Sequence, residues 1–256
     1  MAEAARKLDL IDTAPRFTMA DAALLNARFG GASASDLLRT VIGENLLGRV
    51  ATISSFGAES AVLLHLLASI DPSVPVLFLD TGKHFPETLA YRDTLIARLG
   101  LSGVMNLVPD DAEIAKRDQT GLRWSYDPDG CCEIRKVRPL AAALANFDAT
   151  ITGRKGFQSA TRAGLPRFEV DTSDTAGRLK VNPLANWTKA DLDAYVAAHD
   201  LPQHPLVADG YPSIGCAPCT SKVGAGEDPR AGRWRGWDKV ECGIHIPTQP
   251  GEDPIF

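Results

Sequence analysis

The strongest constraint on the fold is a strand–helix pattern that occurs twice between residues 49 and 99. Residues 49–54, with Val50, Ala51 and Ile53 at their centre, predict a buried strand, and an apolar helix is predicted over residues 61–69. A second buried strand is predicted over residues 76–80, and a second helix over residues 86–99. Strands that are joined through helices at this spacing lie parallel, so we predict a βαβ unit.

The rest of the chain extends this unit into an α/β domain. Further strands are predicted over residues 104–108 and 149–152, and a short antiparallel pair over residues 167–170 and 179–182. Further helices are predicted over residues 20–29, 35–47 and 189–199, from Asp110, and from the cysteine pair at 131–132 to Asn146 with an interruption near Pro139. We therefore predict a Rossmann-like, mostly parallel sheet with helices on both faces.

Local signals indicate where several helices begin. Asp21 and Ser35 are the predicted N-caps of the first two helices, because short polar side chains there bind free backbone amides. Thr188 is the predicted cap of the helix at 189–199, and Asp191 completes a capping box.

Two segments are expected to be irregular. Residues 121–130 are predicted to form a loop, with Trp124 and Tyr126 packing beneath it. Residues 224–239 contain too many glycines, prolines and charges for a rigid element.

The length of 256 residues suits one large α/β domain with an appendage. We predict a domain over residues 1–220, with its N-terminal helices at about 19–47, and a flexible C-terminal tail over residues 221–256. The apolar faces of the N-terminal helices can pack on the sheet or on a second subunit, so a homo-oligomer is compatible with the sequence.

Composition excludes several classes of protein. A net charge of −5 argues against a nucleic-acid binder, although it allows a local basic pocket for a small anion. No apolar run approaches the ~18 residues of a membrane span. Residues 1–9 mix acids and bases and do not form a secretory signal, so we expect a cytoplasmic protein.

The loops after the first two predicted strands have the composition of ligand sites. Residues 54–60 join a strand directly to a helix, and backbone N–H groups at a helix N-terminus attract anions. The loop contains one glycine and no Gly-x-Gly-x-x-Gly or Walker motif, so a capped helix start without a ligand is the alternative. The candidate binding residues in the two loops are Ser54, Ser55, Gly57 and Glu59, and Asp80, Thr81 and Gly82.

The five cysteines fall into two pairs and one single residue. A disulfide framework is a poor interpretation for a chain of this size without an export signal. Cys216-Ala-Pro-Cys219 is compatible with zinc, with iron–sulfur or with a redox pair. The adjacent residues Cys131 and Cys132 lie only ~3.8 Å apart at Cα, which resists wrapping both thiolates round one ion. A [4Fe–4S] cluster fits this arrangement better, because each of its four irons can bind one cysteine, and a zinc site is the alternative.

Cys242 is the single cysteine, and its surroundings suit thiolate chemistry. It lies in the motif Glu-Cys-Gly-Ile-His, with His245 after it and Arg230 and Arg233 before it. Cations favour the ionised thiol, and the thiolate is the nucleophile. Lys136 lies four residues after Cys132, on the helix that the cysteine pair is predicted to open. A cation there can offset the charge of a cluster and reach an anionic substrate. A solvated lysine is the alternative.

Several short motifs occur in a fixed order between residues 50 and 245. They are Ser54-Ser-Phe-Gly-Ala-Glu-Ser60, Leu79-Asp-Thr-Gly-Lys-His-Phe-Pro-Glu-Thr88, Cys131-Cys132 with Lys136-Val137, Gly153-Arg154-Lys155, Cys216-x-x-Cys219, Arg230-Ala-Gly-Arg233-Trp234 and Glu241-Cys-Gly-Ile-His245. As a set they resemble the assimilatory adenylylsulfate (APS) reductases and the related phosphoadenylylsulfate (PAPS) reductases. No single motif is specific, but the ordered set is.

The resemblance implies an adenine-nucleotide α-hydrolase-like fold and the thiol-dependent reduction of APS to sulfite and AMP. By matching motif, Cys242 attacks the sulfate sulfur and leaves an S-sulfonate, and thioredoxin or glutaredoxin then releases sulfite. The same resemblance assigns Cys131, Cys132, Cys216 and Cys219 to a [4Fe–4S] cluster with a structural and electrostatic role. It assigns the phosphosulfate to Lys136, Arg154, Arg230, Arg233 and His245, the nucleotide to the loop at 54–60, and the adenosine to the neighbourhood of Asp80, Thr81 and Gly82.

Three other functions are compatible with parts of this pattern. The order Ser-Ser-Phe-Gly in the first loop is similar to PAPS reductases, whereas Ala58-Glu59 is similar to APS reductases, so a 3′-phosphorylated substrate is one alternative. An iron–sulfur tRNA-thiolating ATP pyrophosphatase is a second, but its Ser-Gly-Gly-x-Asp-Ser loop is absent and the net charge does not suggest RNA binding. A zinc-stabilised nucleotide-binding module is the third, and it leaves Cys242 without a role.

Overall fold

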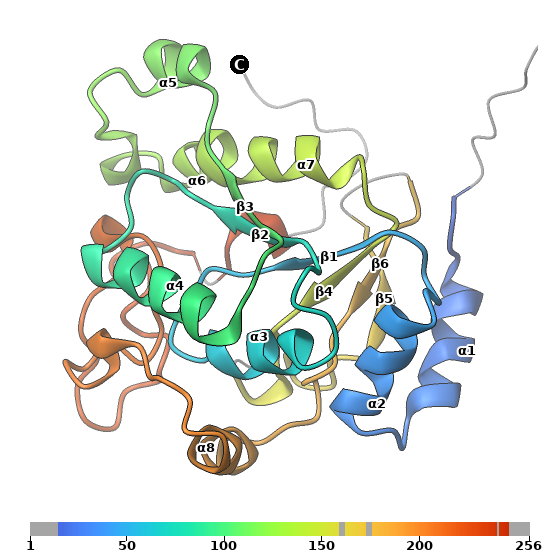
Figure 1. The fold of residues 1–256 in the computed structure, drawn as a ribbon. Helices are drawn as coiled ribbons and strands as arrows, with labels where there is room; N and C mark the ends of the chain where they lie inside the picture. Colours follow the sequence, from blue (N-terminus) through green and yellow to red (C-terminus); the bar gives the residue numbers. More distant parts are fainter. Residues whose placement is uncertain (1–14, 159–161, 173–175, 240, 246–256) are drawn as a thin grey trace, which may run out of the picture.

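The fold is organised around one six-stranded sheet (Figure 1). The computed structural model describes residues 15–158, 162–172, 176–239 and 241–245. The strands are β1 (Val50–Ile53), β2 (Val76–Leu79), β3 (Val104–Leu107), β4 (Ala149–Thr152), β5 (Phe168–Val170) and β6 (Leu179–Val181). Their order is β3-β2-β1-β4-β6-β5, and every neighbouring pair is parallel except β5 with β6. The predicted mostly parallel sheet is confirmed.

Helices cover both faces of this sheet, as predicted (Figure 1). On one face lie α1 (Met19–Phe29), α2 (Ala34–Leu38), α3 (Ser60–Ala68), α4 (Pro86–Leu99) and α8 (Lys189–Ala198). On the other face lie α5 (Asp111–Arg117), α6 (Pro128–Cys132) and α7 (Arg138–Leu144).

Alternation along β2 explains why both faces are filled. Val76 and Phe78 join the larger apolar core under α3 and α4, whereas Leu77 and Leu79 pack with Leu140 of α7 on the opposite face. Successive side chains of a strand point to opposite faces, so a strand that is apolar throughout needs helices on both sides.

The caps of the first two helices differ from the prediction. Thr18, not Asp21, caps α1: its side chain accepts a hydrogen bond from the Asp21 amide, and the Asp21 carboxylate accepts one from the Thr18 amide. Ser33, not Ser35, caps α2, which continues as a π-helix over Arg39–Gly43 and ends earlier than predicted. Several polar residues near each helix start satisfy the local rule, and only the backbone conformation selects one of them. The predicted capping box of Thr188 and Asp191 on α8 is confirmed.

The segment that carries the first cysteine pair is also more helical than predicted. Pro128 begins α6, so Cys131 and Cys132 end this helix rather than open one. A π-helix (Glu133–Val137) leads directly into α7, and Pro139 lies in its first turn, where a helix tolerates proline. Residues 121–130 are not entirely loop, and Tyr126 is 65% exposed rather than packed.

The described part of the C-terminal segment lies against the domain. Glu241 pairs with Arg162 at 2.9 Å, Lys239 pairs with Asp129, and Ile244 packs against the apolar cluster that includes Leu140. The domain boundary at residue 220 and the flexibility of the tail stay predictions. Among the described residues, no helix is long and apolar enough to cross a membrane.

Candidate active site

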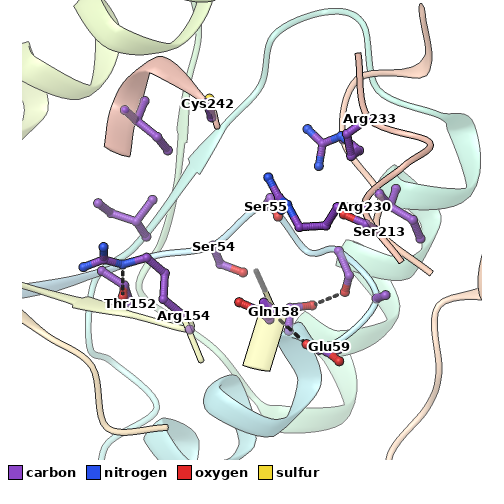
Figure 2. Close-up of a pocket in the computed structure, with 18 of the residues that line it drawn as sticks. Ser54, Ser55, Glu59, Thr152, Arg154, Gln158, Ser213, Arg230, Arg233 and Cys242 are labelled. Atoms are coloured by element: carbon purple, nitrogen blue, oxygen red, sulfur yellow. Dashed lines mark hydrogen bonds between the residues drawn. The ribbon is translucent and has the colours of Figure 1, made fainter. Parts of the chain in front are cut away.

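A cavity of about 250 Å³ lies beyond the carboxyl ends of β1 and β4. It is lined by the β1–α3 loop, the end of β4 and the 3-10 turn after it, and segments within residues 212–216, 230–234 and 241–244. Figure 2 shows Cys242 and Arg233 at the top of this cavity and Glu59 near the bottom. Open α/β sheets bind their ligands at this edge, so this cavity is the candidate active site.

The β1–α3 loop is held in place by a buried aromatic residue. Phe56 is fully buried against Phe78, with the rings edge to face at 5.4 Å, and its φ of 47° turns the chain sharply. Ser54 Oγ accepts a hydrogen bond from the Phe56 amide at 3.2 Å. No side chain caps the first turn of α3, so its free amides are available to an anion. The predicted residues Ser54, Ser55, Gly57 and Glu59 all line the cavity.

Glu59 is the centre of a small polar network at one end of the cavity. Its Oε2 atom accepts hydrogen bonds from Lys155 Nζ at 2.9 Å and Gln158 Nε2 at 2.8 Å. The Lys155 side chain is 3% exposed. Burial lowers the pKa of Lys155, and the Glu59 carboxylate works against that effect. One acid therefore neutralises one buried cation beside the loop.

Arg154 is paired in a similar way. Its guanidinium contacts the Glu169 carboxylate and donates from Nε to Thr152 Oγ1 at 3.3 Å. Burial, reinforced by the charge of Arg162, lowers the pKa of Arg154 to about 10, so it stays charged at neutral pH. The predicted residue Arg154 is at the cavity, but a carboxylate already balances its charge.

Cys242 lies beside Lys136 and Arg233. Within the described part of the chain, these two cations of the cavity form no ion pair, whereas Arg162 and Arg230 pair with Glu241. The neighbouring Cys132 thiol and then Lys136 hold the pKa of Cys242 well below its ordinary value, although burial opposes them. Arg233 stacks on the Trp234 ring at 4.4 Å. Both the Arg233 Nε atom and the Trp234 indole nitrogen are buried without a hydrogen-bond partner among the described residues.

The four paired cysteines line one small second cavity together with Lys136. Thr81 Oγ1 lies 3.3 Å from Cys216 Sγ, and the Trp234 amide donates to the Cys219 carbonyl at 3.0 Å. Within the described residues, no group of three or more His, Cys, Asp or Glu side chains is arranged to hold a single metal ion. The structure thus gathers the two cysteine pairs, but not as ligands of one ion.

Some predicted residues lie outside the main cavity, and several residues that line it were not predicted. Asp80 and Gly82 line neither cavity, and the Asp80 carboxylate accepts a hydrogen bond from the Gly82 amide within their own loop. Thr81 lines the cysteine cavity. His245 ends a short 3-10 helix, but its side chain lies outside the described residues. The main cavity is also lined by residues that were not among the predicted ones: Thr152, Lys155, Gln158, Arg162, Ser213 and Glu241. Only Lys155 and Glu241 lay inside motifs that could have indicated them.

Comparison with known protein families gives one match that covers most of the domain. Residues 49–222 match the phosphoadenosine phosphosulfate reductase domain. The adenosine 5′-phosphosulfate reductase of Mesorhizobium japonicum is 49% identical over 241 residues, which are 94% of this chain and 93% of that protein. The protein of the same name from Mycolicibacterium smegmatis is 42% identical over 221 residues, covering 86% of this chain and 91% of its own.

Solved structures agree on the fold. The crystal structure of phosphoadenylyl-sulfate reductase from Candida auris, a phosphate complex, superimposes with a TM-score of 0.67 and 28% identity, covering 81% of this chain and 98% of that one. The FMN adenylyltransferase of Candida glabrata, in complex with FAD and pyrophosphate, gives a TM-score of 0.52 at 14% identity, covering 76% of this chain and 69% of that one. The second likeness concerns the fold alone.

Proposed function

The chain belongs to the phosphoadenosine phosphosulfate reductase family, and from that premise we propose that it reduces adenosine 5′-phosphosulfate to sulfite and AMP in sulfate assimilation. The placement of Cys242 in the candidate site, beside Lys136 and Arg233, is the observation that carries the proposal. The adenosine 5′-phosphosulfate reductases that are 49% and 42% identical support this substrate.

The cavity can accommodate a nucleotide with its phosphosulfate directed at Cys242. The uncapped first turn of α3 offers amides to the phosphate, and Ser54 and Ser55 offer hydroxyls. Lys136 and Arg233 stand beside Cys242 and provide two positive charges for the two charges of a phosphosulfate. Cations placed there stabilise negative charge that develops on the departing AMP.

The reaction then needs one displacement at the sulfate sulfur and two thiol exchanges. The Cys242 thiolate attacks the sulfate sulfur, an S–S bond forms, the S–O bond to the phosphate breaks, and AMP leaves with the electron pair. A dithiol of the thioredoxin or glutaredoxin class then attacks Cys242 Sγ and expels sulfite, and its second thiol resolves the mixed disulfide. The dithiol supplies the two electrons of the reduction. Since both steps require reduced thiols, we place the reaction in the cytoplasm.

A [4Fe–4S] cluster held by Cys131, Cys132, Cys216 and Cys219 is part of the proposal. The fit rests on the donor set, because four thiols line one cavity. The Thr81 hydroxyl already lies at Cys216 Sγ, where it can donate to a thiolate. The cavity measures about 10 Å³, so the cysteine side chains must rotate apart to admit a cluster. When bound, the cluster supplies structural cohesion and an electrostatic field, and no electrons.

An anaerobic assay tests the proposal. Chain purified without oxygen should release sulfite from APS in the presence of thioredoxin, and much more slowly from PAPS. Mass spectrometry after exposure to APS alone should find an SO₃ adduct on the peptide that contains Cys242. Cys242→Ser should form no adduct and release no sulfite, while it keeps its affinity for AMP. Turnover by Cys242→Ser, or a wild-type chain that binds AMP without forming the adduct, contradicts the proposed mechanism.

A further inference from the structure

The residue immediately before Cys242 is clamped by an arginine from a distant part of the chain. Arg162 donates from Nε to Glu241 Oε1 at 3.0 Å and from Nη2 to Glu241 Oε2 at 2.9 Å. The two side chains are only 10% and 15% exposed. Arg230 Nη2 adds a longer contact to the same carboxylate at 3.4 Å. A bidentate, charge-assisted pair that is mostly shielded from water is much stronger than a surface ion pair.

The other side of Arg162 is fixed as well. Its Nη1 atom donates to Gln158 Oε1 at 2.6 Å, and Gln158 Nε2 donates to Glu59 Oε2 at 2.8 Å. The Gln158 amide has a single favourable orientation, because a flip would place its nitrogen against the guanidinium and its oxygen against the carboxylate. Glu59 lies in the β1–α3 loop, so a continuous chain of polar contacts runs from this loop to the residue before Cys242.

Arg162 is poorly suited to bind a substrate anion directly. Its Nε, Nη1 and Nη2 atoms all donate to protein groups, and the Glu241 carboxylate balances its charge. Cys242 also has an apolar support, since Ile244 packs against the core cluster that includes Leu140 of α7. The short segment around Cys242 is therefore held by a polar clamp before the cysteine and by an apolar contact after it.

We propose that Arg162 is a positioning residue, which acts through Glu241 to hold Cys242 at the end of the cavity and is itself oriented by Gln158. The inference deepens the proposed function and rests on it, because it concerns the placement of the proposed nucleophile. Misplacing a reacting atom by about 1 Å can cost about 100-fold in rate, so loss of the clamp should slow the chemical step and leave nucleotide binding intact.

The test uses the anaerobically prepared full chain and the variants Arg162→Gln, Glu241→Gln and their double variant. The rate of S-sulfonate formation on Cys242 is measured in a single turnover with APS, and AMP affinity is measured by calorimetry. Each single variant should form the adduct about tenfold or more slowly, with AMP affinity within about twofold of the wild type. The double variant should be no slower than the worse single variant, because both changes break the same contact.

Two further variants make the test specific. Arg162→Lys keeps the charge but loses the bidentate geometry, so it should recover part of the rate. Arg235→Gln is the matched control: Arg235 pairs with Glu227 at 2.9 Å on the same C-terminal segment, but with side chains 47% and 40% exposed. It should leave both the rate and AMP affinity unchanged.

The outcomes separate the inference from the proposed function. Additive defects in the double variant, a normal rate in Glu241→Gln, or a fall in AMP affinity that accounts for the slower rate overturns the positioning role alone. A wild-type chain that binds AMP but forms no S-sulfonate overturns the proposed function and the inference with it.

Discussion

Asp118→Asn tests the buried ion pair between Asp118 and Arg135, which lies next to the cysteine site. Arg135 Nε and Nη2 donate to Asp118 Oδ2 at 3.1 and 2.6 Å, and the side chains are 9% and 0% exposed. Arg135 Nη1 also donates to the Thr81 carbonyl at 2.9 Å, and the Thr81 hydroxyl reaches Cys216. Arg135 follows Cys131 and Cys132 in the π-helix, so its bond to Thr81 ties this segment to the loop after β2, while Asp118 holds the guanidinium in place.

The expected cost follows from the burial of the pair. Removing one partner of a buried ion pair typically costs about 3–5 kcal/mol, because the other charge stays in a dry environment. Arg135 keeps its bond to the Thr81 carbonyl, so we expect the lower end, about 3 kcal/mol. For a domain of this size that corresponds to a melting temperature lower by about 6–12 °C.

Thermal and urea unfolding at pH 7 measure this loss. Glu113→Gln is the matched control, because Glu113 pairs with Arg138 at 2.9 Å with side chains 29% and 47% exposed. It should cost less than about 1 kcal/mol. A loss below about 1 kcal/mol for Asp118→Asn would refute the argument that the buried pair stabilises this site.

The pH dependence gives an independent check. Burial alone would raise the pKa of Asp118, but the Arg123 amide and then the Arg135 guanidinium lower it below its ordinary value of 3.8. A carboxyl with a lowered folded-state pKa contributes stability that is complete above its unfolded pKa and is lost as the pH falls through the folded-state pKa. The difference between wild type and Asp118→Asn should therefore be constant from pH 7 to 5 and shrink below about pH 4. A difference that changes between pH 7 and 5 would mean that another group is responsible.

Three further predictions follow from other contacts. Glu59→Gln removes the acid that neutralises Lys155 in the cavity, so the affinity for the anionic nucleotide AMP should rise in calorimetry. An unchanged affinity contradicts this account. Cys219→Ala should lose iron in metal analysis of anaerobic protein and yet keep AMP affinity, since Cys219 does not line the main cavity; full iron content would remove it from the cluster site. His204 is 1% exposed, its Nδ1 accepts the Leu206 amide, and burial lowers its pKa to about 4. Between pH 6.5 and 4 the unfolded chain therefore has a protonated His204 and the folded chain a neutral one. The free energy of unfolding should fall by up to about 3 kcal/mol as the pH drops through this range, and His204→Gln should reduce this fall in urea titrations.

Local patterns in the chain were sufficient for most of the secondary structure. The helix predicted over residues 86–99 matches α4 at both ends, because Pro86 suits a first turn and Gly100 adopts the left-handed conformation that ends a helix. The strands β1, β2 and β4 were predicted within a residue or two, because short runs of apolar and β-branched residues fit a sheet that is covered on both faces. Where the local rule allowed several answers, as for the caps Thr18 and Ser33, the prediction was wrong by two or three residues.

The sequence by itself determined the sheet, the two cysteine pairs and the single cysteine, because periodicity and motif spacing are properties of neighbouring residues. Only the tertiary structure decided which charges meet. Arg162 and Glu241 are 79 positions apart, and Lys155 and Glu59 are 96 apart. No local signal encodes such pairings, because any of the 27 basic residues can in principle neutralise any of the 32 acids. The fold selects a few of them by bringing loops from different strands to one edge of the sheet, where burial makes an unpaired charge costly.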